Sequence, residues 1–263
     1  MLKRSSRKNL RLFLAAWLAC GCAAGFPALA SEGAAAQATV AVASNFLGPA
    51  RELQARFEKE TGHSLKLVGG STGKLYAQIL HGAPVDLFLA ADQKRPESLA
   101  RQGRVQARIT YARGRLALWS AREGYLGPDP VAQLRQGRFR RLAIANPKTA
   151  PYGQAARAVL ERLDLWKRLA PKRVRGENIG QTFQFVATDN AELGFVALAQ
   201  VRDPRLRIRG SAWVVPENWH APLNQDAVLL KRGSGNSAAR AFFDYLQSAE
   251  ARAVLKQYGY GLP

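Results

Sequence analysis

Cysteine, histidine and acidic residues are scarce in this chain of 263 residues. Both cysteines, Cys20 and Cys22, lie near the N-terminus, and the three histidines, His63, His81 and His220, are far apart. The rest of the chain therefore has no cysteine with which to form a disulfide framework. The histidines lack the spacing of a metal site, so we expect no metal ion held by protein ligands and no cofactor.

Acidic residues number 19 against 39 lysines and arginines, which gives a formal net charge of +20. A basic protein of this size raises the possibility of a nucleic-acid partner. The positive residues are spread along the chain, however, and no zinc-finger, RNP or helix-turn-helix pattern is present, so we expect no nucleic-acid partner. We interpret the charge as a long-range field that attracts anions and keeps the protein soluble.

Long hydrophobic runs are also rare, and the longest lies at the N-terminus. An apolar run over residues 12–26 follows five basic residues and precedes the small-residue site Ala28-Leu29-Ala30. This is the pattern of a signal peptide over residues 1–30, cleaved near Ala30, and the run is too short and too interrupted for a membrane-spanning helix. We therefore predict export to the periplasm, with a charge of +15 once the five basic residues are removed.

Two details of the export signal stay open. Ser6-Arg7-Lys8 resembles a twin-arginine signal without its second arginine, so the general and the twin-arginine routes both remain. Lipidation of Cys20 or Cys22 would tether the protein to a membrane, but Trp17-Leu18-Ala19 fits the expected lead-in poorly. A soluble periplasmic protein is the favoured interpretation.

The composition and the hydrophobic pattern indicate an α/β fold. Apolar residues make up 47% of the chain, and apolar strand-like runs alternate with helical patterns. The continuous apolar run over residues 83–92 indicates a strand buried on both faces. The expected strands cover residues 39–43, 65–68, 83–92, 109–119, 142–146, 194–198 and 225–230, and the expected helices cover residues 46–60, 74–82, 153–163, 182–187, 238–246 and 249–258.

The order of these elements predicts two lobes, each a mixed sheet flanked by helices. Residues 31–112 and 224–263 would form the first lobe, and residues 113–223 the second. The chain would cross between the lobes at about residues 110–116 and 220–228. Two such crossings form a hinge.

Two stretches place small hydroxyl and amide side chains where an apolar strand gives way to a helical pattern. Ser44 and Asn45 follow the strand at 39–43, and Ser71 follows the strand at 65–68. Serine in this position caps a helix, and the first N–H groups of a helix have no partner within it and bind anions. Two such ends facing one cavity would form an anion site, whereas each taken alone is better explained as an ordinary helix cap.

Two other patterns suggest chemistry but fit it poorly. Asp86 and Asp92 flank one buried strand at opposite ends, so they should not share a substrate, and we assign both structural roles. Residues 70–74 resemble a phosphate-binding loop, but the required gap between glycines and a second acidic strand for magnesium are missing. We therefore predict that the protein is not an enzyme, with a periplasmic ester hydrolase as a less favoured alternative.

Five motifs together resemble the molybdate-binding periplasmic proteins of ABC transporters, and they occur in the family's order over nearly the whole chain after residue 30. The resemblance implies a two-lobed periplasmic binding protein of type II that captures molybdate or tungstate in the cleft between its lobes. It would deliver the anion, as a monomer, to the membrane permease of an ABC transporter. The motifs are Ala43-Ser44-Asn45-Phe46, residues 70–79, residues 82–92, residues 145–153 and Glu177-Asn178-Ile179.

The resemblance also implies which residues hold the oxyanion. In the first lobe these are Ser44, Asn45 and Ser71. In the second lobe they are Tyr152 and Ile179, which would act through N–H groups at the starts of their helices. Molybdenum would be present only inside the oxyanion, without direct protein ligands.

One position departs from the family pattern. Many members carry a tyrosine just after the Gly-x-Val strand, where its hydroxyl reaches the anion, and here Ala197 stands at that place. We expect Tyr152 to supply compensating contacts.

A site built only from hydrogen-bond donors favours a fully deprotonated dianion, because a protonated phosphate would set its own O–H against a donor. Sulfate meets this condition as well as molybdate does, so a binding protein for another oxyanion is the main alternative. Discrimination between them would depend on cavity size. Molybdate and tungstate have nearly the same size and charge, so the sequence does not rank them.

Overall fold

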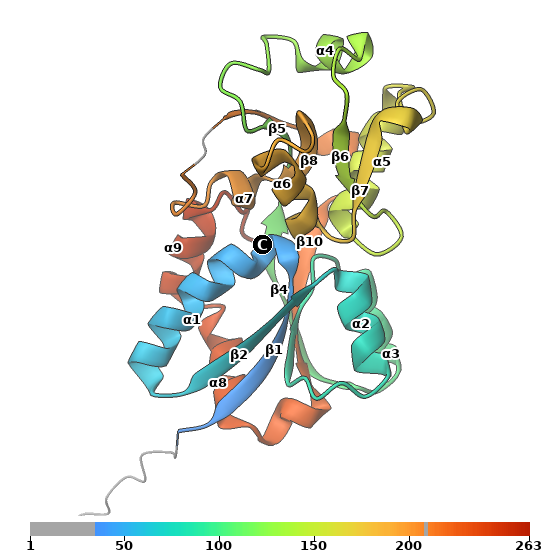
Figure 1. Ribbon diagram of the computed structural model, residues 1–263. Helices are drawn as coiled ribbons and strands as arrows, with labels where there is room; N and C mark the ends of the chain where they lie inside the picture. The colour runs from blue at the N-terminus through green and yellow to red at the C-terminus, as the bar shows by residue number, and fades with distance from the viewer. Residues whose placement is uncertain (1–34, 208–209) are drawn as a thin grey trace, which may run out of the picture. The chain divides into compact units, whose positions relative to one another are not determined.

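The computed structural model describes residues 35–207 and 210–263. The predicted signal peptide, with Cys20, Cys22 and the cleavage position Ala30, lies outside the described residues. Within the described part the chain forms two mixed sheets of five strands each, flanked by helices (Figure 1). The predicted two-lobed α/β class is confirmed. We call the first sheet with its helices the first lobe, and the second sheet with its helices the second lobe.

The first sheet is mixed, with four strands that run in one direction and one that is antiparallel to them. Its members are β1 (Gln37–Ala43), β2 (Ser64–Gly70), β3 (Leu87–Leu89), β4 (Val105–Gly114) and β10 (Leu223–Leu230), in the order β2-β1-β3-β10-β4. β1 is parallel to β2 and β3, whereas β10 is antiparallel to β3 and β4. β3 is apolar and buried along its length, as the continuous apolar run predicts.

Helices cover both faces of the first sheet (Figure 1). Successive residues of a strand point to opposite faces, so Val40 and Val42 pack with Phe57 and Phe242 on one side, while Ala41 packs with the helices on the other. The first layer contains α1 (Leu47–Thr61), α8 (Ser237–Tyr245) and α9 (Ala249–Gln257), and the second contains α2 (Thr72–Leu80) and α3 (Lys94–Arg101). Two short 3-10 helices, η1 (Ser44–Phe46) and η4 (Lys231–Gly235), complete the lobe.

The second sheet repeats this arrangement. It contains β5 (Leu116–Ser120), β6 (Leu142–Ala145), β7 (Arg173–Gly176), β8 (Leu193–Ala197) and β9 (Ser211–Val214), in the order β7-β6-β8-β5-β9. On one face Val159 packs with Leu142, and on the other the Phe183 ring stacks on Trp119 with 4.7 Å between ring centres. The helices are α4 (Pro130–Gln136), α5 (Pro151–Arg162), α6 (Ile179–Ala187) and α7 (Leu198–Val201), with the 3-10 helices η2 (Ala170–Lys172) and η3 (Glu217–Trp219).

The chain passes from one sheet to the other between β4 and β5. Only Arg115 separates the two strands, which belong to different sheets. The prediction of one continuous strand over residues 109–119 is therefore wrong, because a run of apolar residues does not show where the backbone changes sheet. The chain returns to the first sheet between β9 and β10.

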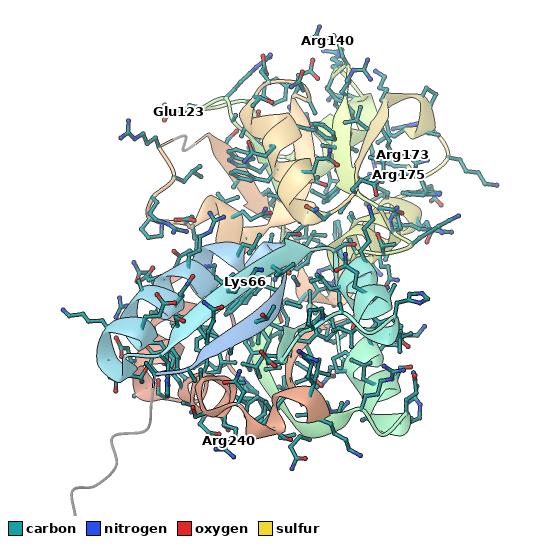
Figure 2. The ribbon with its side chains drawn as sticks, turned by 60° about the horizontal axis from the view of Figure 1, so that its bottom comes forward. Lys66, Glu123, Arg140, Arg173, Arg175 and Arg240 are labelled. Atoms are coloured by element: carbon teal, nitrogen blue, oxygen red, sulfur yellow. The ribbon has the colours of Figure 1, made fainter. Side chains whose placement is uncertain are left out.

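Positive charge is distributed over both lobes. Figure 2 shows Lys66 and Arg240 on elements of the first lobe, Arg173 and Arg175 on β7 of the second, and Arg140 in the loop before β6. In the part of the chain that the structure describes, no helix combines the length and the apolar character needed to cross a membrane.

Candidate functional site

Ser44 and Ser71 leave the first sheet at the same edge. β1 and β2 are parallel, and their last residues, Ala43 and Gly70, are paired in register. The residues that follow them directly, Ser44 and Ser71, therefore lie at neighbouring strand ends. The carboxyl ends of parallel strands are where α/β folds bind their ligands.

The second lobe places two further predicted residues in the same way. β6 and β7 are parallel, with their last residues paired in register. The loops that follow them lead to Tyr152 in the first turn of α5 and to Ile179, the first residue of α6. Asn178 caps α6, because its side-chain oxygen accepts from the Gln181 N–H at 2.9 Å. The N–H of Ile179 has no partner within the helix.

The two serines differ in their local roles. Ser71 is buried and caps α2, because its Oγ accepts from the Lys74 N–H at 3.4 Å, so the predicted cap is confirmed. Ser44 instead opens the 3-10 helix η1, and α1 begins at Leu47 without a side-chain cap. The expectation that Ser44 caps the long helix is therefore wrong, and its hydroxyl is not used in that role.

The two sets of strand ends face each other across the lobes. The Gly73 N–H, next to Ser71, donates to the Thr149 carbonyl at 2.9 Å, just before α5. A Cβ added to Gly180 in α6 would lie 3.4 Å from the Cβ of Ser44. The structure therefore brings the predicted residues of both lobes to one interface.

Charged side chains join the lobes at the rim of this interface. Lys74 Nζ lies 2.6 Å from Glu177 Oε2, which places Lys74 at the rim of the cleft. On another side Arg205 donates to the Gly48 carbonyl at 3.2 Å and pairs with Asp203. Burial acts to raise the pKa of Asp203, but hydrogen bonds from Arg205 outweigh burial and lower that pKa. The structure thus shows the two lobes in contact.

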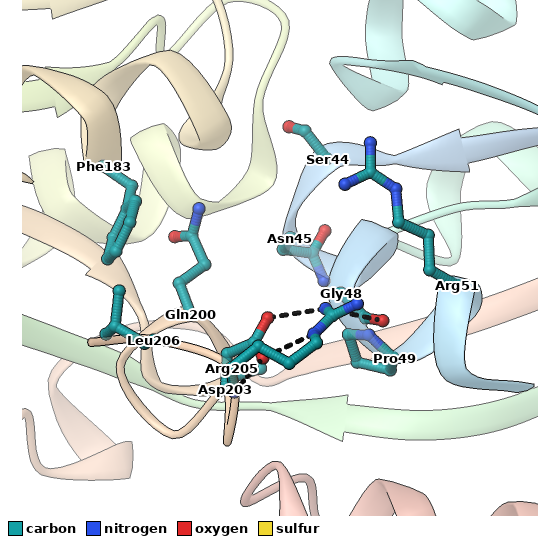
Figure 3. A pocket seen from close by; sticks show the side chains of 11 residues that line it. Ser44, Asn45, Gly48, Pro49, Arg51, Phe183, Gln200, Asp203, Arg205 and Leu206 are labelled. Atoms are coloured by element: carbon teal, nitrogen blue, oxygen red, sulfur yellow. Dashed lines mark hydrogen bonds and ion pairs between the residues drawn. The ribbon is translucent and has the colours of Figure 1, made fainter. Parts of the chain in front are cut away.

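A cavity of about 330 Å³ lies beside Ser44 and Asn45, between the lobes. Figure 3 shows that Ser44, Asn45 and Arg51 reach it from the first lobe, and Phe183 and Gln200 from the second. The guanidinium group of Arg51 has no ion-pair partner among the described residues, and Arg51 lines the same cavity as Ser44 (Figure 3). Positive charge therefore borders the cleft, while Ser44 itself is uncharged.

The side chains of Asn45 and Tyr152 point away from the strand ends into a buried polar network. Asn45 Nδ2 donates to Gln225 Oε1 at 2.9 Å and to the Tyr260 hydroxyl at 3.0 Å. Gln225 Nε2 donates to the Tyr152 hydroxyl at 3.2 Å, and Gln225 Oε1 also accepts from the Tyr111 hydroxyl. Since Tyr152 belongs to the second lobe and the others to the first, this network ties the lobes together.

Burial raises the pKa values of the three phenol groups of this network. Tyr111, Tyr152 and Tyr260 are each at most 5% exposed. Burial is the largest cause that raises the pKa of each hydroxyl above its ordinary value of 10.0. The Tyr152 hydroxyl accepts from Gln225 Nε2 inside this network, and whether it compensates for the tyrosine absent at Ala197 stays a prediction. Sequence reasoning missed the network, because its members are up to 215 positions apart.

The side chain of Gln200 lies beside Ala197. Ala197 is the position that departs from the tyrosine of the family pattern. Gln200 Oε1 accepts from the Ala197 N–H at 3.0 Å, and Gln200 Nε2 donates to the Ile179 carbonyl at 3.1 Å. The end of β8 and the start of α6 are therefore linked by one side chain. This link holds the first turn of α6 in position.

The two aspartates have separate structural roles, as predicted. Asp86 Oδ2 accepts from the Thr39 N–H at 2.8 Å at the start of the sheet. Asp92 Oδ1 accepts from the Arg95 N–H at 3.1 Å at the start of α3. The Asp92 carboxylate also forms an ion pair with the Arg95 guanidinium. Across residues 35–207 and 210–263, no three histidine, cysteine, aspartate or glutamate side chains form a group able to hold a metal ion.

Comparisons with known proteins agree with this architecture. The family model described as bacterial extracellular solute-binding protein matches residues 38–261. Molybdate-binding protein ModA of Azotobacter vinelandii is 49% identical over 242 residues, which span 91% of this chain and 96% of that protein. Molybdate-binding protein ModA of Rhodobacter capsulatus is 42% identical over 234 residues, with 88% and 91% covered.

A solved structure of a molybdate-binding protein is also similar to this chain. The periplasmic molybdate-binding protein of Azotobacter vinelandii aligns with a TM-score of 0.81 at 39% identity, covering 86% of this chain and 99% of that one. The resemblance indicated by the five sequence motifs is confirmed by these relatives. The chain belongs to the family of bacterial extracellular solute-binding proteins.

Proposed function

We propose that this protein captures molybdate or tungstate in the cleft between its lobes and delivers it to the membrane permease of an ABC transporter. The observation that carries the proposal is the meeting of four strand ends, each followed by a serine hydroxyl or by a helix N-terminus, across one interface. The names of the relatives at 49% and 42% identity support the identity of the anion.

In this proposal Ser44 and Ser71 bind the oxyanion through their hydroxyls. Ser71 Oγ already accepts from the Lys74 N–H, so its own proton is available to donate. The Asn45 amide is committed to Gln225 and Tyr260, so Asn45 would contribute its backbone N–H.

In the second lobe Tyr152 and Ile179 would also contribute backbone N–H groups, from the first turns of α5 and α6. None of the five predicted residues carries a charge. About six charge-assisted hydrogen bonds at the upper value of roughly 3 kcal/mol each, less an association cost of roughly 6 kcal/mol, would leave about 12 kcal/mol, which corresponds to nanomolar binding.

The proposed lobe boundaries lie within two residues of the end of β4 and the start of β10. Residues 31–112 and 224–263 would move as the first lobe and residues 113–223 as the second, with the β4–β5 and β9–β10 connections as hinge. A ligand that contacts both lobes favours the form in which they touch.

The cellular part of the proposal is export to the periplasm with cleavage near Ala30. The family of extracellular solute-binding proteins supports this location. We further propose that the protein acts as a monomer and as a carrier without catalytic activity. Molybdate or tungstate is its cargo, and no cofactor is required.

Isothermal titration calorimetry with molybdate, tungstate, sulfate and phosphate tests the proposed ligand. We expect one site per chain, nanomolar affinity for molybdate and tungstate, and far weaker binding of sulfate and phosphate. Sulfate binding as tight as that of molybdate would favour the alternative oxyanion. No saturable binding of any of the four anions would overturn the proposal.

A further inference from the structure

A second cavity, of about 470 Å³, lies in the second lobe and shares no lining residue with the cleft cavity. Four positively charged side chains border it: Lys148, Arg157, Arg173 and Arg175. They come from the loop before α5, from α5 itself and from the edge strand β7. Figure 2 shows Arg173 and Arg175 close to each other on one side of the lobe. We call this cavity the arginine pocket.

Packing fixes two of these guanidinium groups. The guanidinium carbon of Arg173 lies 3.4 Å from the centre of the Trp166 ring, and that of Arg157 lies 5.2 Å from the same ring. Arg157 is also held by Glu161 at 2.7 Å. Two like charges are therefore kept beside one indole, and their mutual repulsion has to be offset by the fold or by a ligand.

The positive charge of the pocket is largely uncompensated. Among the described residues, Lys148, Arg173 and Arg175 form no ion pair. The carboxylate of Glu177 also lines the pocket, but it is paired with Lys74 of the first lobe. Arg173 Nη1 is buried without a hydrogen-bond acceptor. A buried donor without a partner destabilises a fold, and an anion would supply the missing acceptor.

Protection of the edge strand β7 against pairing with other chains does not explain this arrangement of arginines. β7 is an edge strand, and charged side chains on edge strands prevent pairing with other chains. That role requires charges exposed to water, as Arg175 is. It does not require Arg173 to lie against Trp166 with one nitrogen buried.

We propose that the arginine pocket is a second anion-binding site, for a small molecule that carries two or more phosphate or carboxylate groups. Arginine presents a planar fork of N–H groups that binds such groups through two parallel hydrogen bonds. The cavity has about fifteen times the volume that one water molecule takes in the liquid, so it exceeds the size of a single tetrahedral oxyanion. Ile144 and Ala170 give it an apolar wall for the body of the molecule.

Calorimetry with pyrophosphate as the probe tests this site. The exported protein is first loaded with one equivalent of molybdate and then titrated with pyrophosphate. We expect one saturable site, and we expect Arg173→Gln and Arg175→Gln each to weaken pyrophosphate binding about tenfold or more. Arg138→Gln is the matched control, since it removes the same charge from an exposed arginine of the same lobe that has no ion pair among the described residues. It should change the affinity less than twofold.

Two further experiments show whether pyrophosphate is bound by the specific geometry of the arginine pocket or only by diffuse positive charge. Arg173→Lys keeps the charge but loses the planar fork, so it should lose most of the affinity that Arg173→Gln loses. Citrate should compete with pyrophosphate, whereas acetate, with a single carboxylate, should not. Equal effects of Arg138→Gln and Arg173→Gln, or no saturable binding of pyrophosphate and citrate, would overturn the proposal. Because Arg175 is exposed, Arg175→Gln should stay folded, and circular dichroism checks this for each variant.

Discussion

The cleft and the arginine pocket present opposite chemistry to an anion. The five residues proposed for the cleft offer uncharged donors, namely serine hydroxyls and backbone N–H groups, whereas the arginine pocket offers guanidinium groups. Uncharged donors in a buried site act only at short range and in one direction, so they select an anion by its size and its protonation state. Charges attract every anion and are screened by salt. If both proposals hold, the high positive charge of this protein and the selectivity of its cleft have different sources.

Removing one donor from the cleft should have the largest effect. Ser71→Ala deletes a hydroxyl at a buried position, so we expect molybdate binding to weaken by about 1.5–3 kcal/mol, or roughly 10- to 150-fold. Titration calorimetry measures it. Ser248→Ala is the matched control, because Ser248 caps α9 in the same way that Ser71 caps α2. An equal loss of molybdate affinity in both variants, or no loss in Ser71→Ala, would remove Ser71 from the site.

The buried network behind the cleft should give the next largest effect. Tyr152→Phe leaves Gln225 Nε2 without its acceptor, so we expect the free energy of unfolding to fall by about 1–2 kcal/mol. The dissociation of molybdate should also become faster, since the lost bond joins the two lobes. Chemical denaturation and stopped-flow measurements give these values.

Tyr76→Phe serves as the control for the network, since it removes a partly buried hydroxyl that bonds to Ser98 within the first lobe. It should leave the dissociation rate of molybdate unchanged. If Tyr152→Phe behaves like Tyr76→Phe in both measurements, the network does not couple the lobes.

The ion pair between Glu192 and Arg140 shows how a guanidinium group stabilises a carboxylate in this fold. Burial acts to raise the pKa of Glu192, but hydrogen bonds from Arg140 and the Arg141 backbone outweigh it and lower the pKa from 4.5 to about 2. A lowered pKa means that the pair stabilises the fold above pH 4.5 and that this contribution is lost as the pH falls toward 2. Glu192→Gln should therefore flatten the fall in stability over this range, as measured by thermal unfolding. If the stability of Glu192→Gln falls between pH 4.5 and 2 as steeply as that of the unmodified protein, Glu192 does not titrate in this way.

The exposed ion pair at the cleft rim should have the smallest effect. Lys74 and Glu177 are each about half exposed, so Lys74→Gln should speed the dissociation of molybdate by less than about fivefold. A hydrogen bond from Lys74 lowers the pKa of Glu177, so this contribution is present at neutral pH and is lost as the pH falls through that lowered pKa. The double variant with Glu177→Gln should match the single variant. An effect of Lys74→Gln that persists in 1 M salt would contradict this assignment.

The sequence predicts the parts of the molecule that depend on local patterns. The apolar run that contains β3 and the strand ends before Ser44 and Ser71 have a local signal. The helix starts near Tyr152 and Ile179 are implied by the family resemblance, and the residue pattern alone places the start of α6 at residue 182 rather than at Ile179. β9 does not, because it has only four residues and is partly exposed, and α4 is a short helix of seven residues. Both were missed.

The polar network could not be predicted from the sequence for a different reason. Gln225 lies within the buried strand β10, and its partners Asn45, Tyr111 and Tyr152 lie 180, 114 and 73 positions away. Only the folded chain brings them together. The arginine pocket was not predicted either, because its charges are spread over residues 148–175 and their common site depends on Trp166.

Stopped-flow kinetics over a salt series tests most directly whether the cleft holds its anion by uncharged donors rather than by diffuse charge. Rising salt should slow the association of molybdate by screening the positive surface, while the dissociation rate, set by desolvated hydrogen bonds, should hardly change. Sulfate, with the same charge and shorter bonds, should bind far more weakly at every salt concentration. A dissociation rate that climbs steeply with salt, or equal affinities for sulfate and molybdate, would contradict the assignment of Ser44, Asn45, Ser71, Tyr152 and Ile179.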